Sequence, residues 1–374
     1  MSAPPPLLYP LASPDLSEAD IAAAVRVLRS GALVQGPEVA LFESRFSAYT
    51  GATHSIAVAN GTIAIQLALE AAGIGPGDEV IVPALSYIAT ANAVVLCGAT
   101  PVFADVDART FNLDPSLIPA AITPRTRSIL PVHEFGLCCA IDEIRAMADK
   151  HGLLVIEDAA CALGSRHRER QAGTFGSLAT FSLHPRKIIT CGEGGVITTT
   201  SDTLADRLRV LRNHGAAVHP RPHAFIAAGH NARLTDFQAA MVSNQLLRLD
   251  DILRHRARLA EIYLTQIRHP ALTLPLVPDT HTPNWQTFHL LLDDTLDQSS
   301  TIAWLRARGI GSNLGAQCMP AQDFYLPRFG DTCPQNFPNA WRAWKKGLAI
   351  PLHEKITLTD ASFIAATLNQ LPNS

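Results

Sequence analysis

Lysine is scarce in this chain, and one lysine lies where a surface charge has little use. Among 374 residues, Lys187 ends the tract FSLHPRK and precedes IITCGEGGVITT, an apolar segment rich in glycine. A lysine amine can lose its proton and attack a carbonyl carbon, whereas a guanidinium stays charged. We therefore expect Lys187 to form a Schiff base. A salt-bridging lysine is the ordinary alternative.

An acid precedes this lysine at the end of a predicted strand. Asp158 closes LLVIED, 29 residues before Lys187 (187 minus 158). Ligands of open α/β sheets collect at the carboxyl ends of the strands. Pyridoxal 5′-phosphate needs a lysine to hold its aldehyde and an acid to keep its pyridine nitrogen protonated. The pair predicts this cofactor, although Asp158 could instead cap a following helix.

A phosphate group would bind where backbone N–H groups converge at the start of a helix. Gly61 and Thr62 follow the predicted strand SIAVA and open a helix near Ile63, so they are candidate phosphate ligands. Ser182, five residues before Lys187, is another. Many strand-to-helix turns have this composition, so the turn alone is a weak signal.

Two further features near these residues allow more than one interpretation. Residues 192–195 (GEGG) could cradle a phosphate, but the chain contains no GxxxxGK[ST] pattern, so a kinase is disfavoured. We expect these glycines to let the backbone pass close to the cofactor lysine. Tyr87 follows a strand end and could lie on the pyridine ring, or it could be a core aromatic residue.

Composition excludes several classes of function. A net charge of −3, with 17% charged and 47% hydrophobic residues, describes an ordinary globular protein that lacks the basic excess of nucleic-acid binders. No apolar run approaches the roughly 20 residues that span a bilayer, and the first residues do not resemble a secretory signal. We expect a cytoplasmic protein without a nucleic-acid or membrane partner.

Cysteines and histidines offer little support for a metal site. The seven cysteines show no paired metal-type spacing, and we expect free thiols. Four histidines fall between His214 and His230, but Pro220 and Pro222 prevent a helix that would pair His219 with His223. We expect no metal, and a mobile loop over the active site in this region.

The elements that must position these residues alternate along the chain. From about residue 55, apolar runs of strand length are separated by helical stretches, which indicates an α/β fold with a mostly parallel sheet flanked by helices. A helix begins after Ser17, and a long amphipathic run from about Leu234 could connect two domains. We expect a large cofactor-binding domain (residues 1–248), which includes the N-terminal helix and the substrate loop, and a smaller C-terminal α+β domain (residues 249–374).

The ordered motifs resemble one family over nearly the whole chain. The segments include LVQGPEVALFESRFSAYTG, VANGTIAIQLAL, GIGPGDEVIVPALSYIATANAV, HGLLVIEDAACALGS, FSLHPRKIITCGEGGVITT and GHNARLTDFQAA. Together they are similar to the DegT/DnrJ-type sugar aminotransferases, which have fold type I and use pyridoxal phosphate. By this resemblance Lys187 binds the cofactor covalently, Asp158 pairs with the pyridine nitrogen, and Tyr87 stacks on the ring. Gly61, Thr62 and Ser182 hold the phosphate.

The resemblance also implies substrates and an assembly. The family moves an amino group, here expected from L-glutamate, to a keto-sugar, here expected to be nucleotide-linked, with pyridoxamine 5′-phosphate as the intermediate form of the cofactor. Its members form homodimers with the active site at the interface, and Asn231 matches an asparagine that reaches the partner's phosphate. Cys161 stands beside the cofactor, where Gln or His is common.

Two departures and two rival functions accompany the resemblance. Ala232 replaces a common aromatic residue, and residues 318–320 (CMP) replace a segment that often carries a histidine, before Tyr325. Both departures bear on the substrate rather than on the cofactor chemistry. A pyridoxamine-dependent sugar dehydratase would carry histidine in place of Lys187. The presence of both Lys187 and Asp158 argues against a non-catalytic relative.

Overall fold

A computed structural model describes residues 7–217, 224–329 and 333–372. Within these ranges seven strands form the central sheet, in the order β1-β10-β9-β6-β5-β2-β4. Strand β10 runs antiparallel to β1 and β9, and the other neighbours are parallel. The strands are β1 (His54–Val58), β2 (Glu79–Pro83), β4 (Thr100–Ala104), β5 (Thr126–Ile129), β6 (Leu154–Asp158), β9 (Leu178–Ser182) and β10 (Gly195–Thr199).

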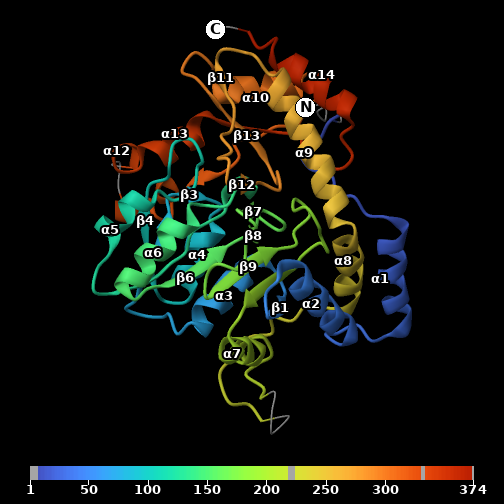
Figure 1. Cartoon of the computed structure of the whole chain (residues 1–374), viewed down its shortest axis with the longest axis vertical. Coiled ribbons are helices and arrows are strands. Elements are labelled where there is room, and N and C mark those ends of the chain that lie inside the picture. The colour runs from blue at the N-terminus through green and yellow to red at the C-terminus, as the bar shows by residue number, and fades with distance from the viewer. Residues whose placement is uncertain (1–6, 218–223, 330–332, 373–374) are drawn as a thin grey trace.

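Helices cover both faces of this sheet, which is why its strands are continuously apolar (Figure 1). On one face, residues such as Ile56 and Val82 pack with α3 (Gly61–Ala71), α4 (Ala89–Leu96) and α7 (Asp202–Arg212). On the other face, Ala57 and Phe181 pack with α2 (Pro37–Thr50) and α8 (Asp236–Leu247). Helix α6 (Ile141–His151) covers β5 and β6 on this side, through Ile129 and its neighbours. The predicted α/β architecture is confirmed.

The N-terminal helix follows from its end residues. Helix α1 (Glu18–Ser30) begins with a capping box, in which Ser17 and Asp20 exchange hydrogen bonds between side chain and backbone. It ends at Gly31, whose φ of 74° is in the left-handed region. The sequence predicted the start of this helix.

The long amphipathic run is two helices rather than one. Helix α8 ends at Leu247, and α9 (Leu249–Gln266) starts after Arg248, whose φ and ψ of −109° and 11° interrupt the helix. The Arg248 guanidinium forms ion pairs with Asp15 and Asp20 at the start of α1. The break therefore lies where the chain is tied to its own N-terminal segment.

The C-terminal part has its own apolar core and sheet. Strands β11 (Leu272–Thr273), β13 (Phe288–Leu292) and β15 (Gly347–Ile350) pack with α9, α10 (Gln298–Arg306) and α14 (Leu358–Leu368). Helix α13 (Pro338–Lys346) leads into β15. Tyr9 pairs with Ile310, so the N-terminal segment also packs against this part. The domain boundary at residue 248 stays a prediction.

The remaining short elements join these layers or lie at their edges. Strand β3 (Leu85–Ser86) pairs with β14 (Gln317–Cys318), which links the end of β2 to the C-terminal part. The others are β7 (Arg166–His167), β8 (Arg170–Gln171), β12 (His281–Thr282), α5 (Ile118–Ala121), α11 (Leu326–Phe329) and α12 (Cys333–Asn336).

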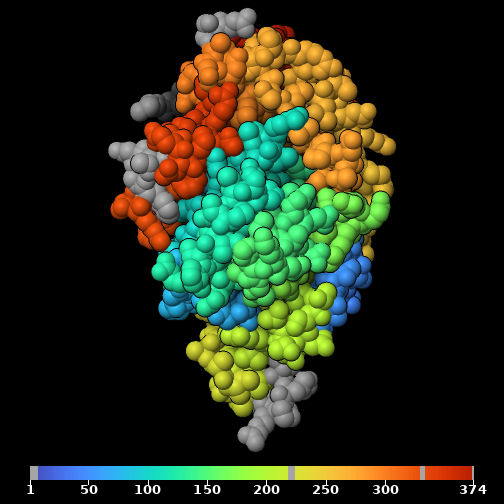
Figure 2. Space-filling model, turned by 60° about the vertical axis from the view of Figure 1, so that its left-hand side comes forward, coloured from blue at the N-terminus to red at the C-terminus, as the bar shows by residue number. Residues whose placement is uncertain are grey.

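One segment projects from the body of the molecule. The chain after α7 extends below the sheet as a narrow protrusion, visible in both views (Figures 1 and 2). Phe225 and Ile226 on this protrusion are 71% and 65% exposed. The histidine-containing segment was expected to cover the active site, but its described residues extend away from this chain's own body; His219 and His223 lie outside the described residues. No helix in the described ranges is both long enough and apolar enough to cross a membrane.

Candidate active site

Asp158 lies at the carboxyl end of β6 and is held there by backbone and side-chain contacts. Its N–H donates to the carbonyl of Pro131 at 2.9 Å, and its carbonyl accepts from the N–H of His133 at 3.0 Å. Its carboxylate accepts from the Thr90 hydroxyl at 2.8 Å and from the Ala160 N–H at 3.1 Å. No helix follows Asp158, since only turns connect β6 to the next strand at Arg166, so the interpretation of Asp158 as a helix cap is wrong. Burial raises the pKa of Asp158 despite these donors and nearby Lys187.

Lys187 contacts a thiol rather than a carboxylate within the described part of the chain. Its Nζ lies 2.9 Å from Cys161 Sγ. Burial acts to lower the pKa of Lys187, but Cys161, Asp158 and Glu134 outweigh it, and the pKa is raised. Burial alone predicted the opposite direction. A cofactor that takes the amine into a Schiff base replaces this ammonium and changes its balance of charges.

The predicted phosphate turn brings together residues that are far apart in sequence. Asn60 caps α3, since its Oδ1 accepts from the N–H of Ile63 at 2.9 Å. Gly61 lies close to the candidate ligand Ser182, because a Cβ added to Gly61 would be 2.8 Å from the Cβ of Ser182. Thr62 follows on the same helical turn. These three candidate ligands therefore share one place at the start of a helix.

The glycines after Lys187 have a different role from the one expected. An added Cβ at Gly195 would lie 2.5 Å from the carbonyl oxygen of Asn60, and one at Gly194 would lie 2.5 Å from Cys191 Sγ. Gly195 thus allows β10 to pass against the phosphate turn, because its antiparallel pairing with β1 brings it there. The close approach is to the turn, not to Lys187.

Tyr87 and Asn231 are both at the surface of this chain. Tyr87 is 66% exposed, so the interpretation as a core aromatic residue is wrong. Asn231 is exposed and pairs through its backbone with Asn213. Neither residue is near enough to Asp158 or Lys187 to form a hydrogen bond with it. Stacking by Tyr87 and a contact of Asn231 with a partner's cofactor stay predictions.

The residues that depart from the family pattern are buried. Ala232 is 1% exposed, and its carbonyl accepts from the N–H of Ala59, immediately before the phosphate turn. Cys318 and Met319 are fully buried, and Tyr325 donates from its hydroxyl to Asn92 Oδ1 at 2.9 Å. The apolar core that packs with α3 and α4 contains Ala232, Cys318, Met319 and Tyr325.

Sequence reasoning missed three polar residues of the site. Ser86 and Thr90 follow β2, and their hydroxyls lie 3.1 Å apart. Glu134 follows β5 and is only 6% exposed. All three come soon after an apolar strand, the same signal that identified Asp158. Parallel strands β2, β5 and β6 are neighbours, so their carboxyl ends meet at one edge.

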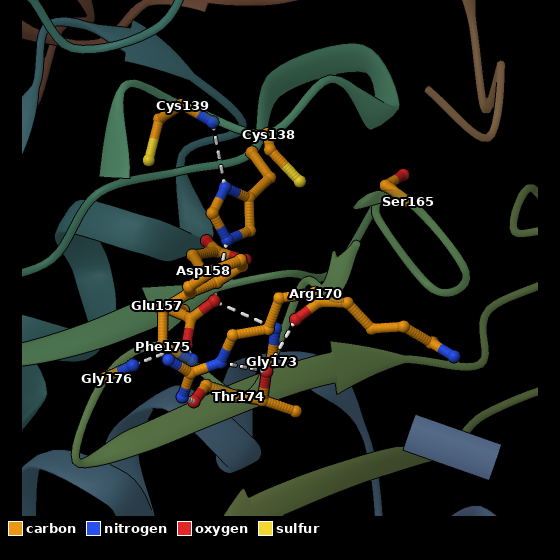
Figure 3. Close-up of polar contacts among 12 residues, drawn as sticks. Cys138, Cys139, Glu157, Asp158, Ser165, Arg170, Gly173, Thr174, Phe175 and Gly176 are labelled. Carbon is orange, nitrogen blue, oxygen red and sulfur yellow. Dashed lines mark hydrogen bonds and ion pairs between the residues drawn. The ribbon is translucent and has the colours of Figure 1, made fainter. Parts of the chain in front are cut away.

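A fully buried hydrogen bond holds the tips of β5 and β6 together beneath the site. His133 Nε2 lies 2.9 Å from Glu157 Oε2, and both side chains are completely buried. The Glu157 carboxylate also accepts from the N–H groups of Gly173, Phe175 and Gly176, as Figure 3 shows. The other ring nitrogen of His133 accepts from the Cys139 N–H. This network holds Glu157, which precedes Asp158, and His133, which precedes Glu134.

The residues of the site fit pyridoxal phosphate. Nowhere in the described ranges do three or more His, Cys, Asp or Glu side chains gather in a way that could hold a metal. Lys187 and the buried Asp158 supply the amine and the acid, and a cation at the ring nitrogen would favour the ionised form of Asp158. The start of α3, opened by Gly61 beside Ser182, supplies donors for a phosphate.

Comparisons with known proteins agree with this geometry. GDP-perosamine synthase from Caulobacter vibrioides is 42% identical over 334 residues, which cover 88% of this chain and 89% of the relative. DesV from S. venezuelae superposes with a TM-score of 0.87 at 36% identity, covering 94% of this chain and 93% of DesV. Spr1654 from Streptococcus pneumoniae, in its PLP-form, superposes with a TM-score of 0.91 at 26% identity, covering 98% of each chain.

The family assignment rests on both sequence and fold. Residues 14–369 match the DegT/DnrJ/EryC1/StrS aminotransferase family. The match includes Asp158 at the end of β6, Lys187 in the segment after β9, and the start of α3. The chain belongs to this family and is a fold type I aminotransferase that uses pyridoxal 5′-phosphate.

Proposed function

We propose that this aminotransferase moves an amino group from L-glutamate to a nucleotide-linked keto-sugar in aminosugar biosynthesis. The observation that carries the chemistry is that the Lys187 amine and the buried Asp158 carboxyl, at the carboxyl edge of the sheet, are close enough for their charges to interact. The sugar acceptor is supported by the 42% identity to GDP-perosamine synthase, whose name specifies a nucleotide-linked aminosugar.

Each residue of the site has a defined task in this proposal. When bound, pyridoxal phosphate supplies an electron sink for the substrate carbon that loses its proton. Lys187 holds the cofactor covalently and, once released, carries the proton between carbon atoms as a general base. Asp158 keeps the ring nitrogen protonated, and Thr90 holds Asp158 in place. Cys161 orients the lysine amine.

The phosphate of the cofactor is assigned to the start of α3. Gly61 and Thr62 offer backbone N–H groups and a hydroxyl there, and Ser182 adds a hydroxyl from the end of β9. The partial positive charge at a helix start favours a phosphate. Tyr87 is assigned to the face of the ring, where its exposed side chain becomes covered.

We also propose a homodimer with the active site at the interface. The protrusion after α7 carries exposed Phe225 and Ile226, and Asn231 lies at its base. Exposed apolar side chains on a projecting segment are typical of a docking surface. A second copy of this chain, which presents the same protrusion in return, forms the symmetric arrangement of most homodimers.

The substrate proposal is tested with a panel of keto-sugars. Each is incubated with purified enzyme and L-glutamate, and release of 2-oxoglutarate is followed. We expect release only with a nucleotide-linked keto-sugar, and none with the Lys187→Ala protein or without an acceptor. Release with free keto-sugars or aminocyclitol ketones, and not with nucleotide-linked ones, would refute the assigned acceptor class. Light scattering measures the mass of the protein, and a monomer would refute the dimer.

A further inference from the structure

A second buried carboxyl, Glu134, lies beside the cofactor site. It comes from the loop after β5, and its N–H donates to Asn112 Oδ1 at 2.8 Å. The next residue, Phe135, has a φ of 55°, a left-handed conformation that is uncommon outside glycine. Its preceding residue, His133, is held on the opposite side by Glu157. The backbone is therefore held on both sides of Glu134, which limits the directions its side chain can take.

Glu134 lies near charged side chains, and one of its two carboxyl oxygens has no hydrogen-bond partner in the described part of the chain. Its Oε2 is buried and has no partner among the described residues. The carboxyl interacts electrostatically with Asp158 and Lys187 and accepts a hydrogen bond from Ser86. Glu134 also lines a pocket together with Arg109 and His289. An unpartnered buried oxygen costs free energy unless a ligand contacts it.

The charges of the site favour the un-ionised form of this carboxyl. Lys187 and Asp158 already balance one another, so an ionised Glu134 would add an uncompensated anion. Burial and the charge of Asp158 raise the pKa of Glu134 to about 8, despite the opposing charge of Lys187. His289 does not supply a cation, because burial lowers its pKa to about 3. Arg109 is the remaining cation on the pocket and is exposed.

We propose that Glu134 is a further cofactor-binding residue, an un-ionised acid that donates a hydrogen bond to an anionic oxygen of the bound cofactor. A carboxylic acid can donate only while it keeps its proton, whereas a carboxylate only accepts. The carboxyl of Glu134 interacts with the charges of both Asp158 and Lys187, the two groups assigned to the cofactor ring, so a ring bound by both comes within range of the same interactions. The inference rests on the proposed placement of the cofactor at these residues.

Proton linkage makes this role measurable without turnover. Pyridoxamine 5′-phosphate binds without a covalent bond to lysine, so its dissociation constant reports the contacts of the site alone. If the protonated acid is the form that binds, the constant rises above about pH 8 by up to tenfold per pH unit. Glutamine is neutral at every pH and keeps an N–H donor. The Glu134→Gln protein should therefore lack this rise.

The experiment titrates pyridoxamine 5′-phosphate into cofactor-free wild-type and Glu134→Gln proteins between pH 6.5 and 9.5. Ionisation of the ligand affects both proteins alike, so the difference between the two curves reports Glu134 together with its effect on the pKa of Lys187. We expect wild type to weaken about tenfold more than Glu134→Gln between pH 8 and 9.5. Equal pH dependence would overturn the inference. Absence of binding in wild type at any pH would instead refute the cofactor placement itself.

A second variant distinguishes a role of the Glu134 proton from a purely structural role of this side chain. The Ser86 hydroxyl stabilises the ionised form of Glu134, so Ser86→Ala should move the bend of the affinity curve to higher pH. A purely structural change would alter the affinity at every pH and leave the bend in place. This variant also tests the inference if Glu134→Gln does not fold.

Discussion

Replacing Gly61 with alanine tests the phosphate site most sharply. Gly61 is the first residue of α3, and its φ is not in the left-handed region, so alanine meets no backbone strain there. Alanine would favour the helix by up to about 1 kcal/mol. Its Cβ, however, would lie 2.8 Å from Ser182 Cβ and 3.1 Å from Ser182 Oγ. The turn and the strand end must therefore move apart.

The expected loss of cofactor affinity in the Gly61→Ala protein follows from how far the turn and the strand end must move apart. Carbon atoms in contact prefer about 3.5–4.0 Å, so relief requires a shift of roughly 1 Å. Such a shift breaks the alignment of at least one hydrogen bond to the phosphate, and bonds to a charged group contribute about 1.5–3 kcal/mol. Affinity should fall about tenfold to hundredfold, because 1.4 kcal/mol corresponds to a factor of ten.

The assay measures binding of pyridoxamine 5′-phosphate to cofactor-free protein by fluorescence titration, with the melting temperature recorded in parallel. Gly75→Ala is the matched control, since its nearest neighbour would be the Cys97 carbonyl oxygen at 3.8 Å and no left-handed φ is involved. Ser182→Ala separates loss of a hydroxyl from loss of space. Wild-type affinity in the Gly61→Ala protein would refute the placement of the phosphate.

Three further predictions concern the lysine, the acid and the support beneath them. Lys187→Ala should lose the visible absorption of bound pyridoxal phosphate and all measurable turnover, because no amine remains to bind the aldehyde. Thr90→Val removes a donor that stabilises ionised Asp158 and should move the acidic limb of kcat/KM to higher pH, as measured from a pH profile. Glu157→Gln should lower the free energy of unfolding by about 3 kcal/mol, measured in urea, since a neutral amide replaces a buried acceptor of several N–H groups.

Each of these has a control drawn from the same chain. Lys187→Arg keeps a charge but cannot form the Schiff base, and visible absorption in it would contradict the assignment of Lys187. Thr90→Ser keeps the donor and should restore the acidic limb. Arg209→Ala breaks an exposed pair with Asp206 and should cost less than about 1 kcal/mol. A comparable loss in Glu157→Gln would show that its buried hydrogen bonds do not stabilise the fold.

The sequence predicted the elements of the fold because its local signals agree. The capping box at Ser17, Gly31 and the apolar strand runs each identify one element. The break at Arg248 was missed, since it depends on a pairing with Asp15 and Asp20 more than 220 residues away. No local residue, neither proline nor glycine, marks it.

The residues of the site were also predicted only in part. Gly61 and Ser182 were predicted as ligands, and their proximity depends on how β1, β10 and β9 pair. Glu134 was missed because a glutamate after a strand has no distinctive spacing. The raised pKa of Lys187 likewise depends on three neighbours that lie far apart in the sequence. Motifs identify single residues, whereas the interactions between them require the sheet.

The antiparallel strand β10 has a consequence for how the protein is made. Strand β1 reaches the other strands of the sheet through β10, which follows it by more than 130 residues. On the ribosome, the phosphate turn must therefore stay apart from Lys187 until residue 199 has left the exit tunnel and β10 has paired. Cofactor capture is then a late event of synthesis, and bound pyridoxal phosphate marks chains whose central sheet is closed.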